Sequence, residues 1–223
     1  MITFKNITII GTSHISPKSV ALVKKTILDE KPEFVGIELD FRRFTHLNSN
    51  AKKRKLSIKD IKTLGMTGFF LNLVGGWLEK KLGELTGSAP GSEMIMAAKA
   101  AKQIDAKILL LDRDITVTLK RLSKKITFKE KMTFVWDIIS APFKKRKIKF
   151  DLKSVPSEEL IITLLKEVKQ KYPNVHKVLL AERDLYMAKG LNTYIGKPEK
   201  VIVVVGAGHE KGVYTHLQRM ARD

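Results

Sequence analysis

The sequence predicts an α/β fold in which helices flank a central, mainly parallel sheet, with helical insertions between the strands. Two continuous Val/Ile runs, at 7–10 and 201–205, are typical of strands that are buried on both faces. Strand-like runs followed by stretches with helical spacing of apolar residues are typical of βαβ chains. The length of 223 residues and the hydrophobic content of 43% suit one globular domain. We therefore expect residues 1–223 to form a single domain.

The first predicted unit is strand, helix, strand. After the strand at 7–10, Ser16 is suited to cap a helix and Pro17 to occupy its first position. This helix should end near residue 30, before Pro32, and a second strand follows at 34–39. A unit of this length should form a right-handed crossover.

The middle of the chain should contain a helical insertion at 42–90. Its beginning, from residue 40 to about 64, is charged and poorly periodic. Its apolar part, 64–85, contains five glycines and resembles a helical hairpin with exposed apolar residues. A helix at 93–104 and a third strand at 107–111 should follow.

A second helical segment is predicted at 115–195, before the last strand at 201–205 and a final helix at 208–220. Residues 142–154 are a basic linker within it. The helices predicted in this segment are 115–122, 127–139, 157–170 and 173–191.

The composition excludes several kinds of site. The chain has no cysteine, so disulfides, thiolate catalysis and cysteine zinc sites are excluded, and any metal must use histidine, carboxylate or amide ligands. We see no signal-peptide pattern and no apolar stretch of the ~20 residues that span a bilayer. We therefore expect a cytoplasmic location, and the absence of cysteine fits a reducing compartment.

The net charge of +19 favours anionic partners. Basic residues cluster at 52–55 and 144–147, without interleaved aromatic residues and without a recognisable nucleic-acid-binding motif. Solubility, a heat-loving host or attraction to an anionic membrane surface explains these lysines better than nucleic acid does. The apolar 64–85 segment could also lie against a bilayer, but core packing or contact between subunits of a homo-oligomer is the commoner explanation.

Two Gly-x-x-His motifs follow the two Val/Ile runs. His14 comes after Gly11 and His209 after Gly206, so parallel strands would bring both histidines to one edge of the sheet. Glycine lets the backbone turn sharply there. Helix capping or core hydrogen bonding is the alternative for each histidine, but the repetition favours a site.

A carboxylate should join these histidines. Glu38 ends the second strand and can act as a metal ligand or a general base. Two imidazoles and one carboxylate with open positions form a catalytic metal site, which predicts His14, Glu38 and His209 as ligands.

Other charged residues have a structural and a functional interpretation. Asp112 and Arg113 end the third strand and either close it as an ion pair or belong to the site. Glu182 and Arg183 lie among apolar residues on a predicted helix, so they either pair with Asp112 or Arg113 or line the site.

Three further residues have simple explanations. Glu93 would compensate the dipole of its helix. Arg42 and Arg43, which follow the second strand, would bind an anionic group or remain surface charges. The absence of a Gly-x-Ser-x-Gly elbow and of a Walker A motif argues against serine hydrolysis and nucleotide binding.

Six blocks in order, from Ile9 to about Gly212, resemble the TraB/PrgY family, which is related to the Tiki proteins. The blocks are GTSHIS at 11–16, VGIELD at 35–40 with Arg42, PGSEM at 90–94, LDRDI at 111–115 with TLKR at 118–121, ERD at 182–184 with Met187 and Ala188, and VVGAGH at 204–209.

The resemblance implies a fold and a chemistry. TraB and PrgY are associated with shutdown of peptide pheromone activity, and Tiki proteins are described as manganese- or cobalt-dependent proteases. The implied fold is shared with erythromycin-esterase-like and ChaN-like proteins. The implied site residues are His14, Glu38 and His209, whereas Glu93, Asp112, Arg113, Glu182 and Arg183 match family blocks without an assigned role.

The leading hypothesis is a metal-dependent hydrolase acting on peptides. Manganese or cobalt is favoured, with zinc as a further candidate, and the ion would be held by the two histidines and a carboxylate. Glu38 or Glu182 would act as ligand or general base, and Arg183 or Arg113 would stabilise the oxyanion. The alternative is a non-enzymatic module that sequesters a peptide or an anion.

The chain differs from many microbial TraB-like proteins, which carry a C-terminal membrane-spanning region, whereas this sequence ends at Asp223. If such a region completes the protein, we expect the domain to lie at the inner face of the cell membrane.

Overall fold

The structure is a computed structural model that describes residues 1–12, 17–48, 91–140 and 158–222. Five strands form one sheet in the order β1-β2-β5-β3-β4. The strands are β1 (Ile2–Phe4), β2 (Ile7–Thr12), β3 (Phe34–Ile37), β4 (Lys107–Leu110) and β5 (Val201–Gly206). All neighbours are parallel except β1, which pairs antiparallel with β2. The predicted α/β fold with a mainly parallel sheet is confirmed.

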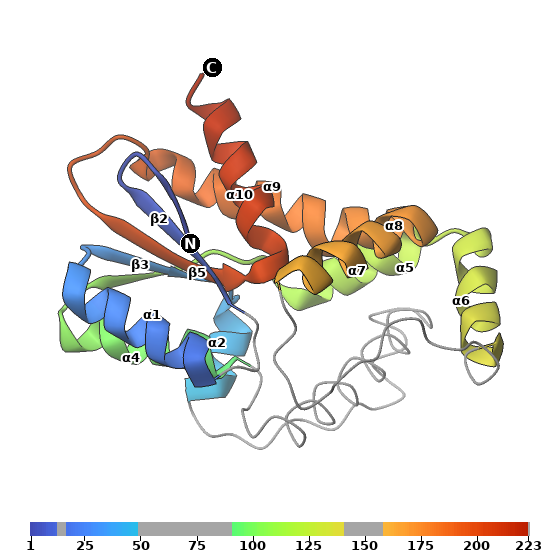
Figure 1. Cartoon of the computed structure of the whole chain (residues 1–223), viewed down its shortest axis with the longest axis horizontal. Helices are drawn as coiled ribbons and strands as arrows, with labels where there is room; N and C mark the ends of the chain where they lie inside the picture. The colour runs from blue at the N-terminus through green and yellow to red at the C-terminus, as the bar shows by residue number, and fades with distance from the viewer. Residues whose placement is uncertain (13–16, 49–90, 141–157, 223) are drawn as a thin grey trace.

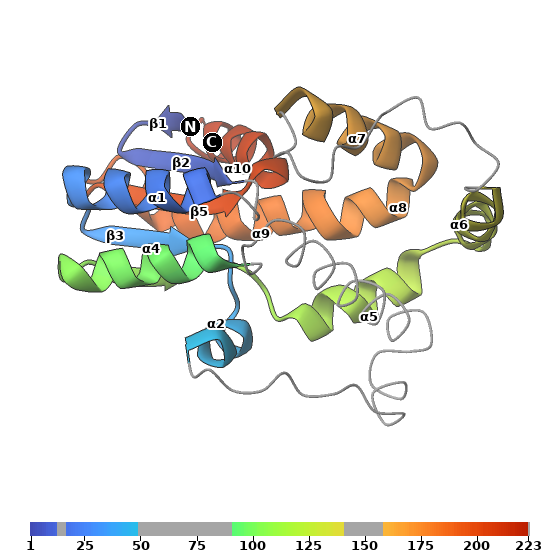
Figure 2. The same cartoon turned by 60° about the horizontal axis from the view of Figure 1, so that its bottom comes forward.

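Helices cover both faces of the sheet (Figures 1 and 2). Helices α1 (Pro17–Glu30) and α4 (Ser92–Gln103) lie side by side on one face, and α9 (Glu182–Leu191) and α10 (Ala207–Met220) cover the other. Successive side chains of a strand point to opposite faces. Accordingly, Ile10 of β2 packs with the α1 and α4 core, whereas Ile9 packs with the α9 and α10 core.

The order of the strands creates a topological switch point at their carboxyl ends. The chain leaves β2 and β3 toward helices on one face, but leaves β5, which lies between them, toward α10 on the other. Parallel α/β sheets bind ligands where neighbouring strands connect to opposite faces in this way. The residues that follow Ile37, Leu110 and Gly206 therefore meet at one edge.

A further group of helices extends away from the sheet as an arm (Figure 1). One long helix connects the arm to the sheet: α8 (Pro173–His176) continues through a π-helical turn, Lys177–Ala181, into α9. A short 3₁₀ turn, Asn192–Tyr194, follows. The other helices of the arm are α5 (Ile115–Lys125), α6 (Phe128–Ser140) and α7 (Glu158–Lys171).

Two elements differ from the sequence prediction. Strand β1 was not expected; it joins β2 through a two-residue hairpin at Lys5 and Asn6. Helix α2 (Phe41–Asn48) lies where the sequence is charged and poorly periodic, because Phe44 and Leu47 supply an apolar side that packs on the α1 and α4 core. Each is too short for its periodicity to stand out.

Several predictions fall outside the described residues. They are the remainder of the 42–90 insertion with its apolar 64–85 part, the Ser16 cap and the basic linker at 142–154. Within the described residues, no helix has both the length and the apolar composition needed to cross a membrane.

Candidate functional site

Glu38 ties two neighbouring strands together at the carboxyl edge of the sheet. It directly follows β3 and is buried, with 7% of its surface exposed. Its Oε2 accepts a hydrogen bond of 2.7 Å from the backbone N–H of Gly206, at the end of β5. A buried carboxylate must be paired or hydrogen-bonded to be tolerated, so Glu38 is fixed in place on this side and presents Oε1 to the centre of the site.

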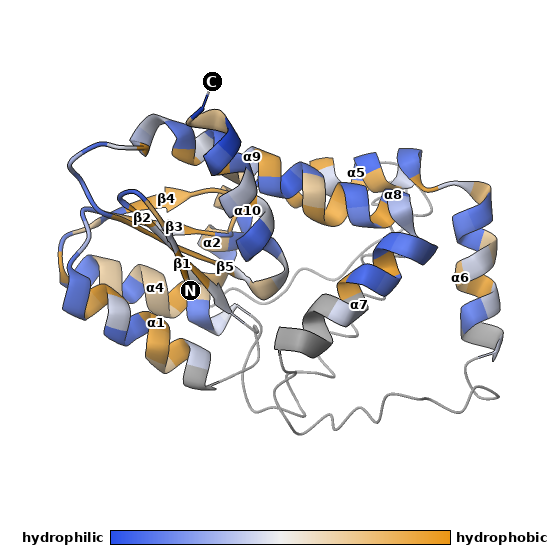
Figure 3. Cartoon of the chain, turned by 45° about the horizontal axis from the view of Figure 1, so that its top comes forward, coloured by the Kyte–Doolittle hydropathy of each residue, from blue (hydrophilic) through white to orange (hydrophobic). Residues whose placement is uncertain are grey.

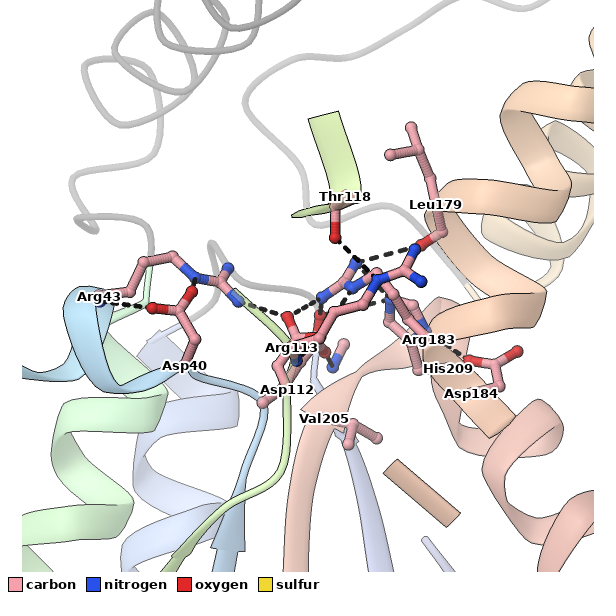
Figure 4. Close-up of polar contacts among 12 residues, drawn as sticks. Asp40, Arg43, Asp112, Arg113, Thr118, Leu179, Arg183, Asp184, Val205 and His209 are labelled. Atoms are coloured by element: carbon pink, nitrogen blue, oxygen red, sulfur yellow. Dashed lines mark hydrogen bonds and ion pairs between the residues drawn. The ribbon is translucent and has the colours of Figure 1, made fainter. Parts of the chain in front are cut away.

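Arg183 is at the centre of the site (Figure 4). It pairs with Asp112 through two hydrogen bonds, Nε to Oδ1 at 3.1 Å and Nη2 to Oδ2 at 2.7 Å. Its Nη2 also pairs with Oε1 of Glu38, and its Nη1 lies 3.1 Å from Nε2 of His209. A bidentate guanidinium–carboxylate pair fixes both distance and orientation. Arg183 therefore links the ends of β3 and β4 to α10.

The carboxylates keep Arg183 charged. Burial alone would lower the pKa of its guanidinium, but the negative charges of Glu38 and Asp112 outweigh burial and raise the pKa above its ordinary value. The side chain of Arg183 is only 14% exposed. A fixed cation in a poorly hydrated site is suited to stabilise a negative charge on a bound ligand.

The π-helical turn precedes Arg183 and helps to orient it. The carbonyl oxygen of Leu179, inside this turn, accepts a hydrogen bond of 3.1 Å from Nη1 of Arg183. Single π turns within α-helices are frequent at functional sites because they re-aim the side chains that follow.

His209 is held by a carboxylate that the sequence did not single out. Its Nδ1 lies 2.5 Å from Oδ1 of Asp184, and both side chains are buried. A carboxylate accepts and a guanidinium donates, so the partners assign the proton to Nδ1 and leave the lone pair of Nε2 facing Arg183. The same Nε2 is 3.3 Å from Oε1 of Glu38.

Gly212 makes room for Asp184. An ideal Cβ at position 212 would lie 2.0 Å from Oδ2 of Asp184, which no side chain could tolerate. The Asp184 carboxylate thus packs directly on the backbone of α10, one turn after His209. The glycine at 212 and the aspartate after Arg183 are the sequence signals that could have indicated this contact.

Asp112 joins a second arginine to the site. Besides Arg183, it pairs with Nη2 of Arg43 and accepts the backbone N–H of Arg113 at 2.8 Å. Arg43, on α2, is oriented by Asp40 through its Nε at 2.6 Å and its backbone N–H at 2.9 Å. Figure 4 shows these residues converging from α2 and the end of β4. The sequence analysis considered Arg43 for an anionic group or a surface charge, and it included Asp40 in the VGIELD block without a role; it did not predict that the two residues pair.

Glu182 belongs to a separate cationic cluster. Its carboxylate pairs with Nη1 of Arg113 at 3.2 Å, Nε of Arg121 at 2.7 Å and Nζ of Lys125 at 2.8 Å. Hydrogen bonds from Arg121 above all, and from Lys125 and Arg113, outweigh burial, which alone would raise the pKa of Glu182, and they lower it to about 2. A carboxylate this acidic is a weak base. Of the two sequence-predicted bases, Glu38 is therefore the better candidate.

The structure brings four of the sequence-predicted residues together, namely Glu38, Asp112, Arg183 and His209. The sequence indicated that Glu182 and Arg183 could pair with Asp112 or Arg113. Both kinds of pair are present, Arg183 with Asp112 and Glu182 with Arg113. His14 lies outside the described residues.

Two predicted residues lie apart from this group of contacts. Arg42 is largely exposed and pairs with Asp114 at 3.2 Å. Glu93 is buried in the first turn of α4, where the hydroxyl of Thr12, the last residue of β2, lies 3.5 Å from its Oε1.

The described residues supply two candidate ligands for a divalent ion, His209 and Glu38. The 3.3 Å between Nε2 of His209 and Oε1 of Glu38 suits two ligands of one ion, since metal–ligand bonds of about 2.1 Å imply separations of roughly 3.0–3.4 Å. Asp184 on Nδ1 of His209 is the carboxylate partner that metal-binding histidines commonly have. Within the described ranges, no three His, Asp or Glu side chains are grouped to hold an ion, and His14 is not among those ranges.

The family model described as TraB/PrgY/gumN matches residues 3–223. The chain belongs to this family. An uncharacterised protein of Methanocaldococcus jannaschii is 38% identical over 217 residues, covering 96% of this chain and 54% of that protein. TraB domain-containing proteins of Mus musculus and Homo sapiens are 27% identical over 232 residues, covering 92% of this chain and 61% of theirs. The chain thus spans a little over half the length of these relatives.

Proposed function

We propose that this TraB-family protein is a metal-dependent hydrolase that acts on peptides. The observation that carries the proposal is the arrangement of Asp184, His209, Glu38 and Arg183 at the carboxyl edge of the parallel sheet. It combines an oriented imidazole, a carboxylate within 3.3 Å of that imidazole and a buried cation. These are the groups that hydrolysis of a carbonyl compound requires.

His209 and Glu38 would hold the ion, together with His14 as the third ligand expected from the sequence. When bound, manganese, cobalt or zinc would polarise the scissile carbonyl and acidify a water. Asp184 keeps the proton of His209 on Nδ1, so the lone pair of Nε2 is available to the ion. To release both ligands, Arg183 gives up the contact of its Nη1 with His209 and that of its Nη2 with Oε1 of Glu38, and it keeps its two hydrogen bonds to Asp112.

Arg183 and Glu38 have the remaining roles. The Asp112 pair pre-orients the Arg183 guanidinium, which then stabilises the negative charge on the carbonyl oxygen during attack. Oε1 of Glu38, the oxygen that does not bind Gly206, either binds the ion or accepts a proton from the attacking water, and the two roles are alternatives. Arg113 is a weaker candidate for the oxyanion, because its guanidinium is already bound by Thr118, Glu182 and the carbonyl oxygen of Val178.

Calorimetric titration with manganese and with cobalt tests the proposal. We expect one ion per chain in the wild type, and loss of binding in His14→Ala and in His209→Ala. His216→Ala is the matched control, since His216 lies two turns further along the same helix, α10. Binding that survives in His209→Ala, or no binding in the wild type, would overturn the metal site.

A second function, sequestration of a peptide or an anion without cleavage, has one observation in its favour. In the structure, Arg183 already donates to both prospective ligands, His209 and Glu38, which is a stable arrangement without an ion. A peptide-library screen separates the two functions. A hydrolase yields cleavage products that disappear in His209→Ala, whereas a binding module shows saturable affinity that depends on Arg183 and no products.

A further inference from the structure

Helix α6 is attached to the arm by one of its faces. A capping box begins the helix, with the backbone N–H of Thr127 bonded to Oε2 of Glu130 at 2.9 Å and that of Glu130 to Oγ1 of Thr127 at 3.2 Å. Glu130 also accepts from the backbone N–H of Asn174 at 2.8 Å. Phe134 meets the ring of Tyr172 edge-on, and Asp137 accepts from the hydroxyl of Tyr172 at 2.8 Å. Residues 130, 134 and 137 thus define the packed face.

The opposite face of α6 is apolar and exposed. Phe128 is 78% exposed and Trp136 67%, and Met132 and Val135 between them are 50% and 46% exposed. Met132 follows Phe128 by four residues, and Val135 and Trp136 follow Met132 by three and four, so the four side chains lie on one stripe of the helix. Figure 3 shows hydrophobic residues on α6, at the end of the arm away from the sheet. Single exposed apolar residues are ordinary, but a continuous stripe of this kind marks an interaction surface.

The charges beside this stripe are positive. At 100° per residue, Lys129 and Lys131 flank the stripe on its two sides, and both are exposed. The acidic residues of the helix, Glu130 and Asp137, lie on the packed face and are bound there. The sequence after the helix continues with the basic run at 144–147, and the whole chain has a net charge of +19. The surface therefore combines apolar anchors with a cationic rim.

We propose that this face of α6 docks on the headgroup region of an anionic lipid bilayer. Trp and Phe are suited to the boundary between headgroups and acyl chains, and lysines on the flanks can extend toward lipid phosphates while their methylenes lie on the apolar surface. A protein partner would need acidic groups around an apolar groove, whereas anionic lipids present both features everywhere. The helix would lie in the plane of the interface, and the proposal is independent of the hydrolase site.

Trp136 is a built-in probe for this docking. The chain has two tryptophans, Trp77 and Trp136, so Trp77→Phe leaves only the one on α6. The full chain with this substitution is mixed with vesicles of phosphatidylglycerol and phosphatidylcholine, or of phosphatidylcholine alone. We expect a blue shift of the emission and co-sedimentation with the anionic vesicles only, both reversed by high salt.

Two pairs of substitutions separate the apolar and cationic contributions. In Lys129→Gln/Lys131→Gln we expect binding to fall roughly 25-fold, about fivefold for each lysine, whereas Lys99→Gln/Lys102→Gln on α4 makes the same charge change without this loss. In Phe128→Ser/Met132→Ser the blue shift should disappear. Leu22→Ser/Phe41→Ser removes residues of similar exposure, 48% and 73%, and should leave it unchanged.

Several results would overturn the proposal. Trp136 emission that does not respond to anionic vesicles would do so, as would an equal response to neutral vesicles. A response that the control variants abolish equally would assign the contact to another surface. Self-association that depends on Phe128, in a chain that does not bind vesicles, would assign this face to a second copy.

Discussion

Alanine at position 212 should disrupt the contact between α9 and α10 that orients His209. An added Cβ would lie 2.0 Å from Oδ2 of Asp184 and 2.5 Å from its Cγ, so the carboxylate must turn away or the helices must separate. Overpacking costs about 1–3 kcal/mol. Loss of the buried bond to His209 adds about 1.5–3 kcal/mol, and alanine regains about 1 kcal/mol in helix propensity. We expect Gly212→Ala to lower the free energy of unfolding by about 2 kcal/mol or more.

Urea unfolding at neutral pH measures this difference, and Gly190→Ala is the control. Gly190 is also helical, but an added Cβ there would meet Cδ2 of Leu111 at an ordinary 3.5 Å. We expect this control to be neutral or up to about 1 kcal/mol more stable. In an Asp184→Ala background, most of the cost of Gly212→Ala should disappear, because the carboxylate is gone. An equal loss in both backgrounds, or a wild-type stability for Gly212→Ala, would refute the reasoning.

Two further predictions concern the charged side chains. Arg183→Met should lower the free energy of unfolding by about 3 kcal/mol or more in urea titrations, because it leaves the buried carboxylates of Glu38 and Asp112 without a shared cation. Arg183→Lys should recover part of that loss. Equal stability of the Met variant and the wild type would contradict the pairing. Because the pKa of Glu182 is lowered from 4.5 to about 2, its contribution to stability is complete above about pH 4.5 and disappears as the pH falls toward 2. The difference in stability between the wild type and Glu182→Gln should therefore shrink across that range in acid-unfolding measurements, and a constant difference would argue against the cation cluster.

The fold followed from patterns that are local in the sequence. Continuous Val/Ile runs predicted β2 and β5, and Pro17 with helical spacing predicted α1, because burial on two faces or on one stripe selects residues at short range. Strand β1, with three residues, and α2, with eight, are too short for such a pattern to stand out. Their stability comes from contacts with distant segments.

The site was predicted in part, for a similar reason. Strand ends are visible in a sequence, so Glu38, Asp112 and His209 could be assigned to one edge of the sheet. The role of Asp184 depends on how closely α9 approaches α10, which only the packed structure determines. The choice between Glu38 and Glu182 as the base depended on the three cations around Glu182, which come from α5 and the loop before it.

The π-helical turn at Lys177–Ala181 has a consequence for how this protein can vary. One extra residue in a single turn shifts the angular phase of a helix by roughly 100°. Helix α8, upstream of the turn, contacts α5 of the arm, and Met187, downstream, is buried against the sheet. Deleting one residue from the turn would rotate one of these surfaces away from its partner. The single extra residue of the π turn thus sets the orientation of the arm relative to the carboxyl edge of the sheet, and it constrains the length of this helix.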